Sequence, residues 1–259
     1  MDAKLSLSSL ERQEMLVKFV EKRERVTVGE ISNHFGVSVA TARRDLETLG
    51  TQGRLQRFHG GAKATRTVPS GPPIQHQTDE QAAEKQRIGW AAAELIEDGD
   101  TVFLGSGTTV LEVAKCLHKR KNLTVITNSL QILYELSVVP DITVVGLGGL
   151  LLNSKMSMIG HITEQALAEV RAQKVVMGIH AIDVKYGLTN DYLPETDTDR
   201  AILAQSGKLI TVADHTKCTR VSTALLAPVT AMQTFVSDVD VSPDFIAELK
   251  VKGIQVILA

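Results

Sequence analysis

The spacing of hydrophobic and polar positions predicts a helix near the start of the chain. Met15, Leu16, Phe19 and Val20 recur at intervals of about one helical turn, which places them on one face. The four residues at positions 8–11, Ser-Ser-Leu-Glu, have the capping-box pattern that begins many helices. We therefore expect a first amphipathic helix with a buried stripe.

A second helix and a tight turn follow the first helix. Thr27-Val28-Gly29-Glu30 repeats the capping-box pattern, and the apolar stripe after it consists of Val28, Ile31 and Phe35. Gly36 supplies a residue that tolerates positive φ and ends this helix, and Ser38 offers a hydroxyl to cap the next one. The pattern predicts two helices joined by a short turn.

The third predicted helix has two chemically different faces. At about 100° per residue, its apolar face contains Val39, Ala42, Leu46 and Leu49. Its opposite face contains Ala40, Thr41, Arg44 and Thr48. We expect the apolar face to pack and the other face to be free to enter a DNA groove, where arginines reach phosphates or guanine edges and small residues allow close approach.

Two basic strands are predicted after this helix, which Gly53 ends. Residues 54–58 alternate polar and apolar positions, and His59-Gly60-Gly61 allows a tight turn before Lys63 and Arg66. A two-faced helix followed by a basic hairpin indicates a winged helix-turn-helix. The candidate DNA-binding residues are Ser38, Ala40, Thr41, Arg43, Arg44, Arg54, Arg57, His59 and Lys63.

Two other interpretations of these residues remain open at this point. Exposed arginines on a helix pair are often only a solvated surface, and a winged helix can bind another protein instead of DNA. The turn, the two-faced helix and the basic hairpin occur in order, which favours DNA. A steep salt dependence of DNA affinity would separate DNA binding from protein binding.

The distribution of charge agrees with a DNA-binding N-terminal part. Positions 1–66 hold 12 Lys and Arg against 8 Asp and Glu, and the rest of the 259 residues hold 16 against 22, so the net charge of −2 conceals a cationic end. Hydrophobic residues make up 43% and charged residues 22%, as in ordinary proteins with a core. Aromatic residues make up only 4%, which disfavours the stacking platforms of single-strand binders.

Cysteine usage and hydropathy point to no metal, cofactor or membrane association. Cys116 and Cys218 stand far apart and in no CxxC arrangement, so we expect neither a zinc site nor a disulfide. No apolar run approaches the roughly 20 residues that cross a bilayer. We expect a cytoplasmic protein without a cofactor and without a membrane partner.

A domain boundary is predicted near residue 67. Residues 67–78 contain three prolines and a glycine without periodicity. The expected organisation is a DNA-binding domain at 1–66, a linker at 67–79 and a larger domain at 80–259.

The larger domain begins with a predicted helix at residues 84–96. Ile88, Ala92 and Leu95 share one stripe of this helix, whereas Trp90 lies elsewhere on its surface. Packing of Trp90 against its own domain is favoured over a dimer contact.

Short apolar runs then alternate with segments of helical periodicity to the end of the chain. Repeated β-then-α units predict an α/β fold with a mostly parallel sheet covered by helices. The predicted strands are 101–105, 123–127, 142–146, 174–179, 208–214, 234–238 and 254–258. The predicted helices are 110–117, 130–136, 162–170, 196–205 and 244–253.

The loops after these strands carry groups suited to a phosphorylated small ligand. The first of these loops, Gly105-Ser106-Gly107-Thr108-Thr109, follows a predicted strand and begins a predicted helix. Its backbone N–H groups and hydroxyls can surround a phosphate. The loop matches neither the P-loop motif nor the GxGxxG motif of nucleotide-binding proteins. Thr127-Asn128-Ser129 and Gly148-Gly149 end the next two strands. Asp214-His215-Thr216-Lys217 ends a later strand and adds a cation. Each loop alone is also a common turn or cap, but ligands of such sheets bind where strands end.

The N-terminal residues resemble those of DeoR-type bacterial repressors. The resemblance covers nearly all of residues 10–62 and is carried by Arg12-Gln13, Val26-Thr27-Val28, Phe35-Gly36-Val37-Ser38, Thr41-Ala42-Arg43-Arg44-Asp45-Leu46 and Arg57-Phe58-His59-Gly60-Gly61-Ala62. The order of GTT, TNS, GG and ADHTK in the larger domain is similar to the sensor domain of the same family.

This resemblance implies a Rossmann-like sensor domain related in fold to ribose-5-phosphate isomerase. It also implies sugar-phosphate binding and oligomerisation, as a homodimer or homotetramer, through that domain. Carried over by position, the ligand site would contain Ser106, Gly107, Thr108, Thr109, Asn128 and Lys217, with Asp183, Glu195 and Arg200 as further contributors. The full set of candidate ligand residues adds Gly105, Thr127, Ser129, Gly148, Gly149 and Asp214.

Four positions depart from the family pattern. Ala42 stands where the family usually has Ile, and Gly50 replaces a helix-favouring residue at a cost of about 1 kcal/mol. Gly105 stands where Asp is frequent, and Asp199-Arg200 replaces a Lys-Arg pair. The last two departures lie near the predicted pocket, so the identity of the ligand does not follow from the family.

The sequence thus indicates a DNA-binding transcriptional regulator, a repressor of sugar or polyol catabolism genes that responds to a phosphorylated sugar. Its partners would be double-stranded operator DNA and the sugar phosphate. The alternative is a sugar-phosphate isomerase with an appended winged helix. The segment 178–181 lacks the acidic cluster that such an isomerase carries after the corresponding strand, which disfavours the enzyme.

Overall fold

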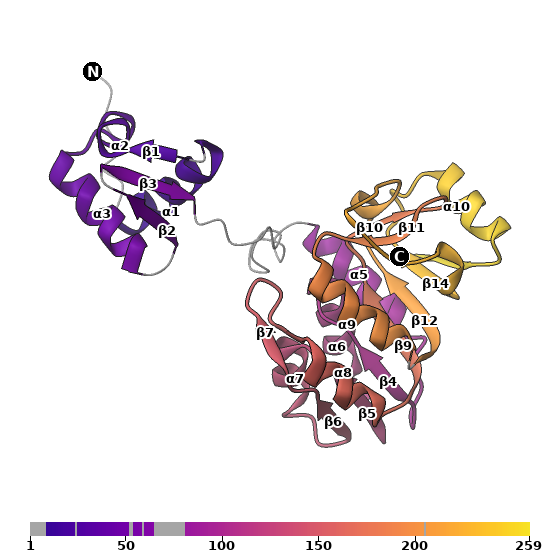
Figure 1. Cartoon of the computed structure of the whole chain (residues 1–259). Helices are drawn as coiled ribbons and strands as arrows, with labels where there is room; N and C mark the ends of the chain where they lie inside the picture. Colours follow the sequence, from indigo (N-terminus) through magenta and orange to yellow (C-terminus); the bar gives the residue numbers. More distant parts are fainter. Residues whose placement is uncertain (1–8, 24, 52–53, 59, 65–80, 205) are drawn as a thin grey trace. The chain divides into compact units, whose positions relative to one another are not determined.

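The computed structural model describes residues 9–23, 25–51, 54–58, 60–64, 81–204 and 206–259 (Figure 1). The chain divides into two compact units, Met1–Val68 and Pro69–Ala259, and each has a hydrophobic core of its own. His59, Gly53 and the expected linker at 67–79 lie outside the described residues.

Three helices and a small sheet form the N-terminal unit. The helices are α1 (Ser9–Arg23), α2 (Val28–Phe35) and α3 (Val39–Thr51), and the strands are β1 (Arg25–Thr27), β2 (Leu55–Phe58) and β3 (Gly61–Ala64). The strands are antiparallel in the order β1-β3-β2, so β2 and β3 form the predicted hairpin. The three helices and the hairpin confirm the predicted winged helix-turn-helix, and β1 is an additional element.

Local signals in the sequence set the ends of α2 and α3. Thr27 Oγ1 accepts a hydrogen bond from Glu30 N at 3.3 Å, and Glu30 Oε2 accepts one from Thr27 N at 2.7 Å, which completes the predicted capping box. Gly36 ends α2 with φ 64°. Ser38 Oγ accepts a hydrogen bond from Thr41 N at 3.1 Å and caps α3.

The apolar face of α3 was predicted correctly except at its first position. Ala42, Leu46 and Leu49 are buried in the N-terminal core. Val39 is 48% exposed, so its assignment to the packed face was wrong. It is the first residue of α3, and the packed stripe begins about one turn later at Ala42.

A charged side chain inside the N-terminal unit connects α3 to α1. Asp45 is 3% exposed and accepts hydrogen bonds from Arg12 Nε at 2.7 Å, Arg12 Nη2 at 3.2 Å and Gln13 Nε2 at 3.1 Å. Because a buried carboxylate is stable only when it is paired and hydrogen-bonded, these bonds hold the two helices in one register. The orientation of the outer face of α3 depends on this contact.

A seven-stranded parallel sheet forms the centre of the C-terminal unit (Figure 1). Its strand order is β15-β14-β12-β9-β4-β5-β6. The strands of this sheet are β4 (Thr101–Leu104), β5 (Leu123–Thr127), β6 (Ile142–Gly146), β9 (Ala172–Gly178), β12 (Ser206–Val212), β14 (Thr234–Ser237) and β15 (Gln255–Leu258). All seven coincide with predicted strands, and their pairing is parallel throughout. The predicted α/β architecture is therefore confirmed.

Helices cover both faces of this sheet, because its strands are apolar on both sides. The helices are α5 (Ala82–Ala93), α6 (Thr108–Lys115), α7 (Leu130–Leu136), α8 (His161–Ala168), α9 (Leu193–Ala204) and α10 (Pro243–Val251), with short 3₁₀ turns η1 (Cys116–Lys119), η2 (His215–Lys217) and η3 (Val229–Ala231). Buried residues of α5, α6 and α7 share one core with alternate residues of the strands, such as Val102 and Leu104. Phe103, between them, packs into the second core with residues of α8, α9 and α10.

Two small antiparallel sheets lie beside the large one and were not predicted. One pairs β7 (Leu150–Leu152) with β8 (Ser157–Ile159), and the other joins β10 (Ala181–Asp183), β11 (Gly187–Asn190) and β13 (Ala224–Ala227). Strands of three or four residues are too short to show a clear period in the sequence.

Trp90 on α5 differs from its expectation. It is 63% exposed, so the predicted packing against its own domain was wrong. The buried stripe of α5 contains Ile88, Ala92 and Ala93, and Trp90 points away from it. Within the described residues, none of the helices has the length and apolar character needed to cross a membrane.

Candidate functional site

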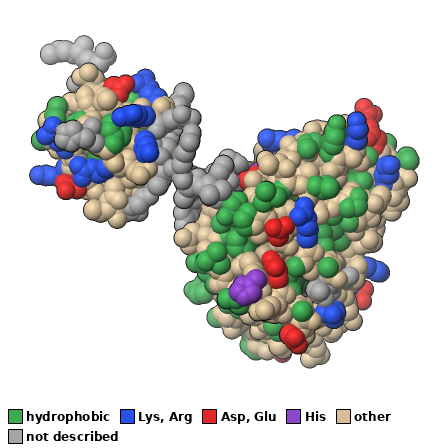
Figure 2. Space-filling view, in the orientation of Figure 1, with side chains coloured by type: hydrophobic (Ala, Val, Ile, Leu, Met, Phe, Trp, Pro, Cys, Tyr) green, Lys and Arg blue, Asp and Glu red, His purple; other side chains and the backbone are tan. Residues whose placement is uncertain are grey.

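The outer face of α3 and the wing present exposed basic side chains. Arg43 and Arg44 on α3 are exposed, as are Arg57 on β2 and Lys63 on β3. Figure 2 shows Lys and Arg side chains on the surface of the N-terminal unit. Ala40 is exposed beside them, so the start of α3 is free of bulky side chains. A surface of this kind can neutralise phosphates while small residues approach base edges.

Arg54 and Arg57 are held by their neighbours. The Arg54 guanidinium donates to both carboxylate oxygens of Glu14, at 2.7 and 2.9 Å, which fixes the start of the wing to α1. A Cβ at Gly50 would lie 2.9 Å from Arg57 Cδ, so the glycine leaves room for the stem of Arg57. Gly50, although unfavourable for a helix, thus lets a wing arginine lie against α3.

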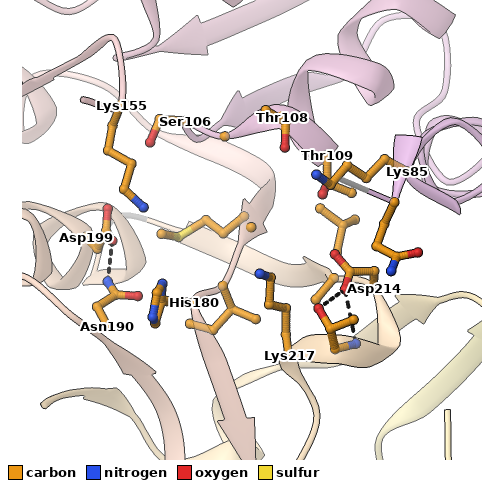
Figure 3. Close-up of a pocket in the computed structure, with 18 of the residues that line it drawn as sticks. Lys85, Ser106, Thr108, Thr109, Lys155, His180, Asn190, Asp199, Asp214 and Lys217 are labelled. Atoms are coloured by element: carbon orange, nitrogen blue, oxygen red, sulfur yellow. Dashed lines mark hydrogen bonds between the residues drawn. The ribbon is translucent and has the colours of Figure 1, made fainter. Parts of the chain in front are cut away.

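A pocket of about 150 Å³ opens in the C-terminal unit where several parallel strands end (Figure 3). Its lining comes from the loop after β4, the end of β9, the loop after β12, β11, α9, α5 and the β7–β8 connection. The polar side chains among the lining residues are Gln81, Lys85, Ser106, Thr108, Thr109, Lys155, His180, Asn190, Glu195, Asp199, Asp214, Thr216 and Lys217. The carboxyl edge of a parallel sheet is where α/β proteins bind ligands.

One end of the pocket is the start of α6. Gly107 precedes the helix with φ 119°, and Thr108 and Thr109 are each 8% exposed. Within the part of the chain that the structure describes, the hydroxyls of Ser106, Thr108 and Thr109 form no hydrogen bond. Buried hydroxyls and the free N–H groups of a first helical turn are ready donors for an anion.

Two lysines line the same region of the pocket. Figure 3 shows Lys217 and Lys85 with their side chains in the pocket, Lys85 beside Thr109. Lys85 on α5 is 6% exposed, so its ammonium is held inside the unit. Cations opposite a helix N-terminus make this end of the pocket suited to a phosphate.

Hydrogen bonds fix the turn that carries Lys217. Asp214 accepts from Thr216 N at 3.0 Å and from the Thr216 hydroxyl, which caps η2. His215 N and Nδ1 lie 2.8 and 2.9 Å from the two carboxylate oxygens of Asp238, which is fully buried. Asp214 therefore lines the pocket mainly as the cap that positions Lys217.

The other end of the pocket is acidic. Glu195 and Asp199 project from α9, and Asn190 Nδ2 donates to Asp199 Oδ2 at 2.8 Å. Burial raises the pKa of Glu195, and burial together with the charge of Glu195 raises the pKa of Asp199 to about 8. Burial also lowers the pKa of the nearby His180, which favours its neutral form.

Seven of the fifteen predicted ligand residues line the pocket, and the other eight lie outside its lining. Those that line it are Ser106, Gly107, Thr108, Thr109, Glu195, Asp214 and Lys217. Those outside its lining are Gly105, Thr127, Asn128, Ser129, Gly148, Gly149, Asp183 and Arg200.

The residues after β5 serve the fold and do not face the pocket. Thr127 Oγ1 donates to Leu104 O at 2.7 Å and accepts from Ser129 N at 3.0 Å. Asn128 Nδ2 donates to Met158 O at 3.0 Å, which holds β8 in place. Ser129 caps α7 by accepting from Ile132 N. Capping a helix is the common structural role of such a loop, and Ser129 has this role instead of binding a ligand in the pocket.

Backbone and surface interactions occupy the other displaced candidates. Gly105 N donates to Val176 O at 2.9 Å within the sheet, and Gly148 O accepts from Thr163 Oγ1 at 2.8 Å beside Gly149. Asp183 Oδ1 accepts from the N–H groups of Lys185 and Tyr186 in the turn between β10 and β11. Arg200 pairs with Asp197 at 2.9 Å and donates to Leu225 O.

Several lining residues were not among the predicted ones. Lys85, Lys155, His180, Asn190 and Asp199 reach the pocket from five different elements. Asp199 alone had a signal in the sequence, as a departure from the family pattern near the pocket. Lys85, Lys155 and Asn190 belong to none of the predicted strand-end loops, and His180 follows β9 but was not predicted to face a ligand, so only the fold brings the four together.

The fold and these two sites define a class of protein: a winged helix-turn-helix joined to an α/β ligand-sensing unit. A family model described as "DeoR-like helix-turn-helix domain" matches residues 12–68, and one described as "DeoR C terminal sensor domain" matches residues 80–239. The chain belongs to the DeoR family of transcriptional regulators.

Named relatives agree with this assignment. The transcriptional repressor AccR of Agrobacterium fabrum is 36% identical over 89% of this chain and 90% of its own length. The glycerol-3-phosphate regulon repressor of Escherichia coli is 33% identical over 82% of this chain and 83% of its own length. The chain is thus a transcriptional regulator and not an enzyme.

Among solved structures, ribose 5-phosphate isomerase A from Methanocaldococcus jannaschii is similar to part of the chain. Its TM-score is 0.41 at 15% identity, with 54% of this chain and 56% of that chain covered. The similarity is too distant to bear on function.

Proposed function

We propose that this protein is a repressor that binds operator DNA through α3 and the β2–β3 wing and is controlled by a phosphorylated sugar or polyol. The effector binds in the pocket of the C-terminal unit. The observation that supports the sensing half is the start of α6, where the hydroxyls of the buried Thr108 and Thr109 form no hydrogen bond with any described residue and line a pocket that also contains lysine side chains.

The chemistry of this end of the pocket favours a phosphate ester. A phosphate dianion accepts hydrogen bonds from hydroxyls and from helical N–H groups, and lysines compensate its charge. Thr108, Thr109 and Lys217 offer these groups within one pocket. Asn190, Glu195 and Asp199 at the other end add acceptors and a donor that suit the hydroxyls of a sugar or polyol.

Control of DNA binding follows from linkage. An effector that binds one arrangement of the sensor units more tightly shifts the population toward that arrangement and changes operator affinity by the same free energy. Reading two half-sites on a duplex requires two winged helices, so we propose a homodimer or homotetramer.

The test begins with a DNA fragment that the wild-type protein selects from a randomised pool. Thermal shift against a panel of sugar and polyol phosphates identifies a stabilising ester, since a bound ligand raises the melting temperature. Gel shift with and without that ester then measures its effect on DNA binding. No shift of melting temperature across the panel, with inorganic phosphate included, would refute the sensing half of the proposal.

The variant Thr108→Val locates the effector on the phosphate-facing loop. We expect it to weaken ester binding at least about tenfold, because a hydrogen bond to a charged group is lost, and to leave operator affinity unchanged. The control variant Thr143→Val makes the same change at an exposed position on β6 and should alter neither ester binding nor operator affinity. A full effector response in Thr108→Val would place the phosphate elsewhere.

A further inference from the structure

The acidic end of the pocket has more negative charge than its surroundings compensate. Glu195 and Asp199 are four residues apart on α9, which places them on one face of the helix. Figure 3 shows Asp199 and Asn190 at the opposite side of the pocket from Thr109 and Lys85. The pocket therefore separates an anion-binding end from a carboxylate end.

Glu195 is a buried residue whose carboxylate has no partner among the described residues. It is only 7% exposed, yet within the described residues it forms neither a hydrogen bond nor an ion pair closer than 4 Å. In the described parts of the chain, the side chain of Asp199 accepts a single hydrogen bond, from Asn190. An unpaired buried carboxylate contributes nothing to the folded state and opposes it when ionised, so a purely structural role does not explain Glu195.

The charged groups around these carboxylates do not remove the imbalance. Lys155 lowers the pKa of both groups through its charge, but among described residues it makes no ion pair with either. Asp191, which raises the pKa of Glu195, adds a further negative charge, and His180 is kept neutral by burial. The net result is raised pKa values, so that the carboxylate pair retains a proton at neutral pH.

We propose that the effector carries a cationic nitrogen in addition to its phosphate, as in an aminosugar phosphate, and that Glu195 and Asp199 bind this nitrogen. The inference rests on the proposed function, because the phosphate end of the pocket orients the ligand. An ammonium has three donors and no acceptor, so it satisfies both carboxylates with charge-assisted hydrogen bonds. A ligand with a neutral hydroxyl in place of the ammonium leaves the Glu195–Asp199 pair protonated and gains no charge-assisted hydrogen bonds from it.

The experiment compares matched ligands that differ only in this nitrogen. Glucosamine, galactosamine and mannosamine 6-phosphates are each titrated against glucose, galactose and mannose 6-phosphates, with the full-length protein at pH 7.5 and EDTA present. We expect at least one amino compound to bind about tenfold or more tightly than its hydroxyl counterpart, and N-acetylation to remove the advantage. EDTA excludes a bridging metal ion as the cause of tighter binding.

Variants on α9 separate the carboxylate effect from general effects on the helix. Glu195→Gln and Asp199→Asn should reduce the preference for the amino compound to less than about threefold and retain binding of the hydroxyl compound. Asp197→Asn is the matched control, because Asp197 lies on the same helix with a side chain that is 62% exposed and pairs with Arg200. It should leave the preference intact.

The pH dependence gives a second measurement. Because the retained proton must leave before both carboxylates contact the ammonium, the ratio of amino to hydroxyl affinity should rise between pH 5.5 and pH 6.5, where the sugar amine, which titrates like an α-amino group at about 7.7, stays charged. The ratio cancels the titration of the phosphate, which both ligands share. In Asp199→Asn the ratio should no longer rise.

The outcomes distinguish this inference from the proposed function. If sugar phosphates bind with no preference for the amino compounds, the cationic nitrogen is refuted and the sugar-phosphate sensor stands. If neither series nor inorganic phosphate binds, the sensor proposal fails and this inference fails with it. A preference that survives in both Glu195→Gln and Asp199→Asn would also overturn the assignment.

Discussion

The basic outer surface of α3 and the pocket of the sensor unit hold their charged groups in opposite environments. Arg43 and Arg44 are exposed on consecutive positions of one helix, where water solvates both side chains. Glu195 and Asp199 belong to a pocket assembled from distant segments, and the burial of Glu195 makes an unsatisfied carboxylate at that position costly. The exposed surface is thus suited to salt-dependent binding of many duplexes, and the pocket to selection of one ligand.

The largest expected effect tests whether the proposed DNA-binding surface of α3 depends on the core of the N-terminal unit. Asp45→Ala leaves Arg12 without its buried partner, and we expect a loss of about 3–5 kcal/mol in the stability of the N-terminal unit. Operator binding should disappear in a gel shift, while effector binding measured by calorimetry stays unchanged. Glu47→Ala, an exposed position on the same helix, is the control. Loss of effector binding in Asp45→Ala would contradict the independence of the two sites.

A smaller effect tests the exposed face directly. Arg44→Ala should weaken operator binding by about 1–3 kcal/mol, roughly fivefold to 150-fold, because one arginine contact to a phosphate or base edge is lost. Affinity is measured by gel shift at several salt concentrations. Arg171→Ala, the same change in the sensor unit, should have no effect. Unchanged affinity in Arg44→Ala would mean that another face of the unit meets DNA.

The smallest effect concerns the pocket without ligand. The pKa of Asp199 is raised to about 8 in the folded protein, so the folded state holds a proton that the unfolded state releases near pH 4. Stability from this group is present at low pH and is lost as the pH rises toward 8. Thermal melts should show that Asp199→Asn gains about 1 kcal/mol relative to wild type between pH 6.5 and pH 7.5.

The control for the pH effect is again Asp197→Asn, whose stability should follow the wild-type pH profile. Glu195 and Lys155 face Asp199 and are unchanged in both variants, so the difference reports Asp199 itself. Parallel pH profiles for wild type and Asp199→Asn would show that this carboxyl is ionised in the folded protein at neutral pH.

The sequence predicted the N-terminal unit more completely than the sensor site. Gly36, Ser38 and the Thr27–Glu30 capping box act on neighbours within a few residues, and the structure contains each of these interactions. The helical periodicity wrongly predicted that Val39 is packed. Periodicity identifies the residues that share a face of the helix, but it does not indicate how much of that face the neighbouring elements cover.

In the sensor unit, the sequence predicted which loops end the strands but not which way their side chains point. Ser106, Thr108 and Lys217 line the pocket as expected. Thr127, with the same chemistry at the end of the adjacent strand, turns its hydroxyl back to Leu104 O. Strand-end position is a property of the sequence pattern, whereas the direction of a hydroxyl depends on the acceptor that packing places beside it.

By itself, then, the amino-acid sequence determined the elements, their β-α order and the basic face of α3, since periodicity and capping are interactions between near neighbours. Only the tertiary structure decided that Lys85, Lys155, His180 and Asn190 share a pocket with Glu195 and Asp199. These residues come from separate helices, strands and turns, and their proximity arises from sheet order and helix packing. The charge imbalance of the pocket is therefore a property of the fold.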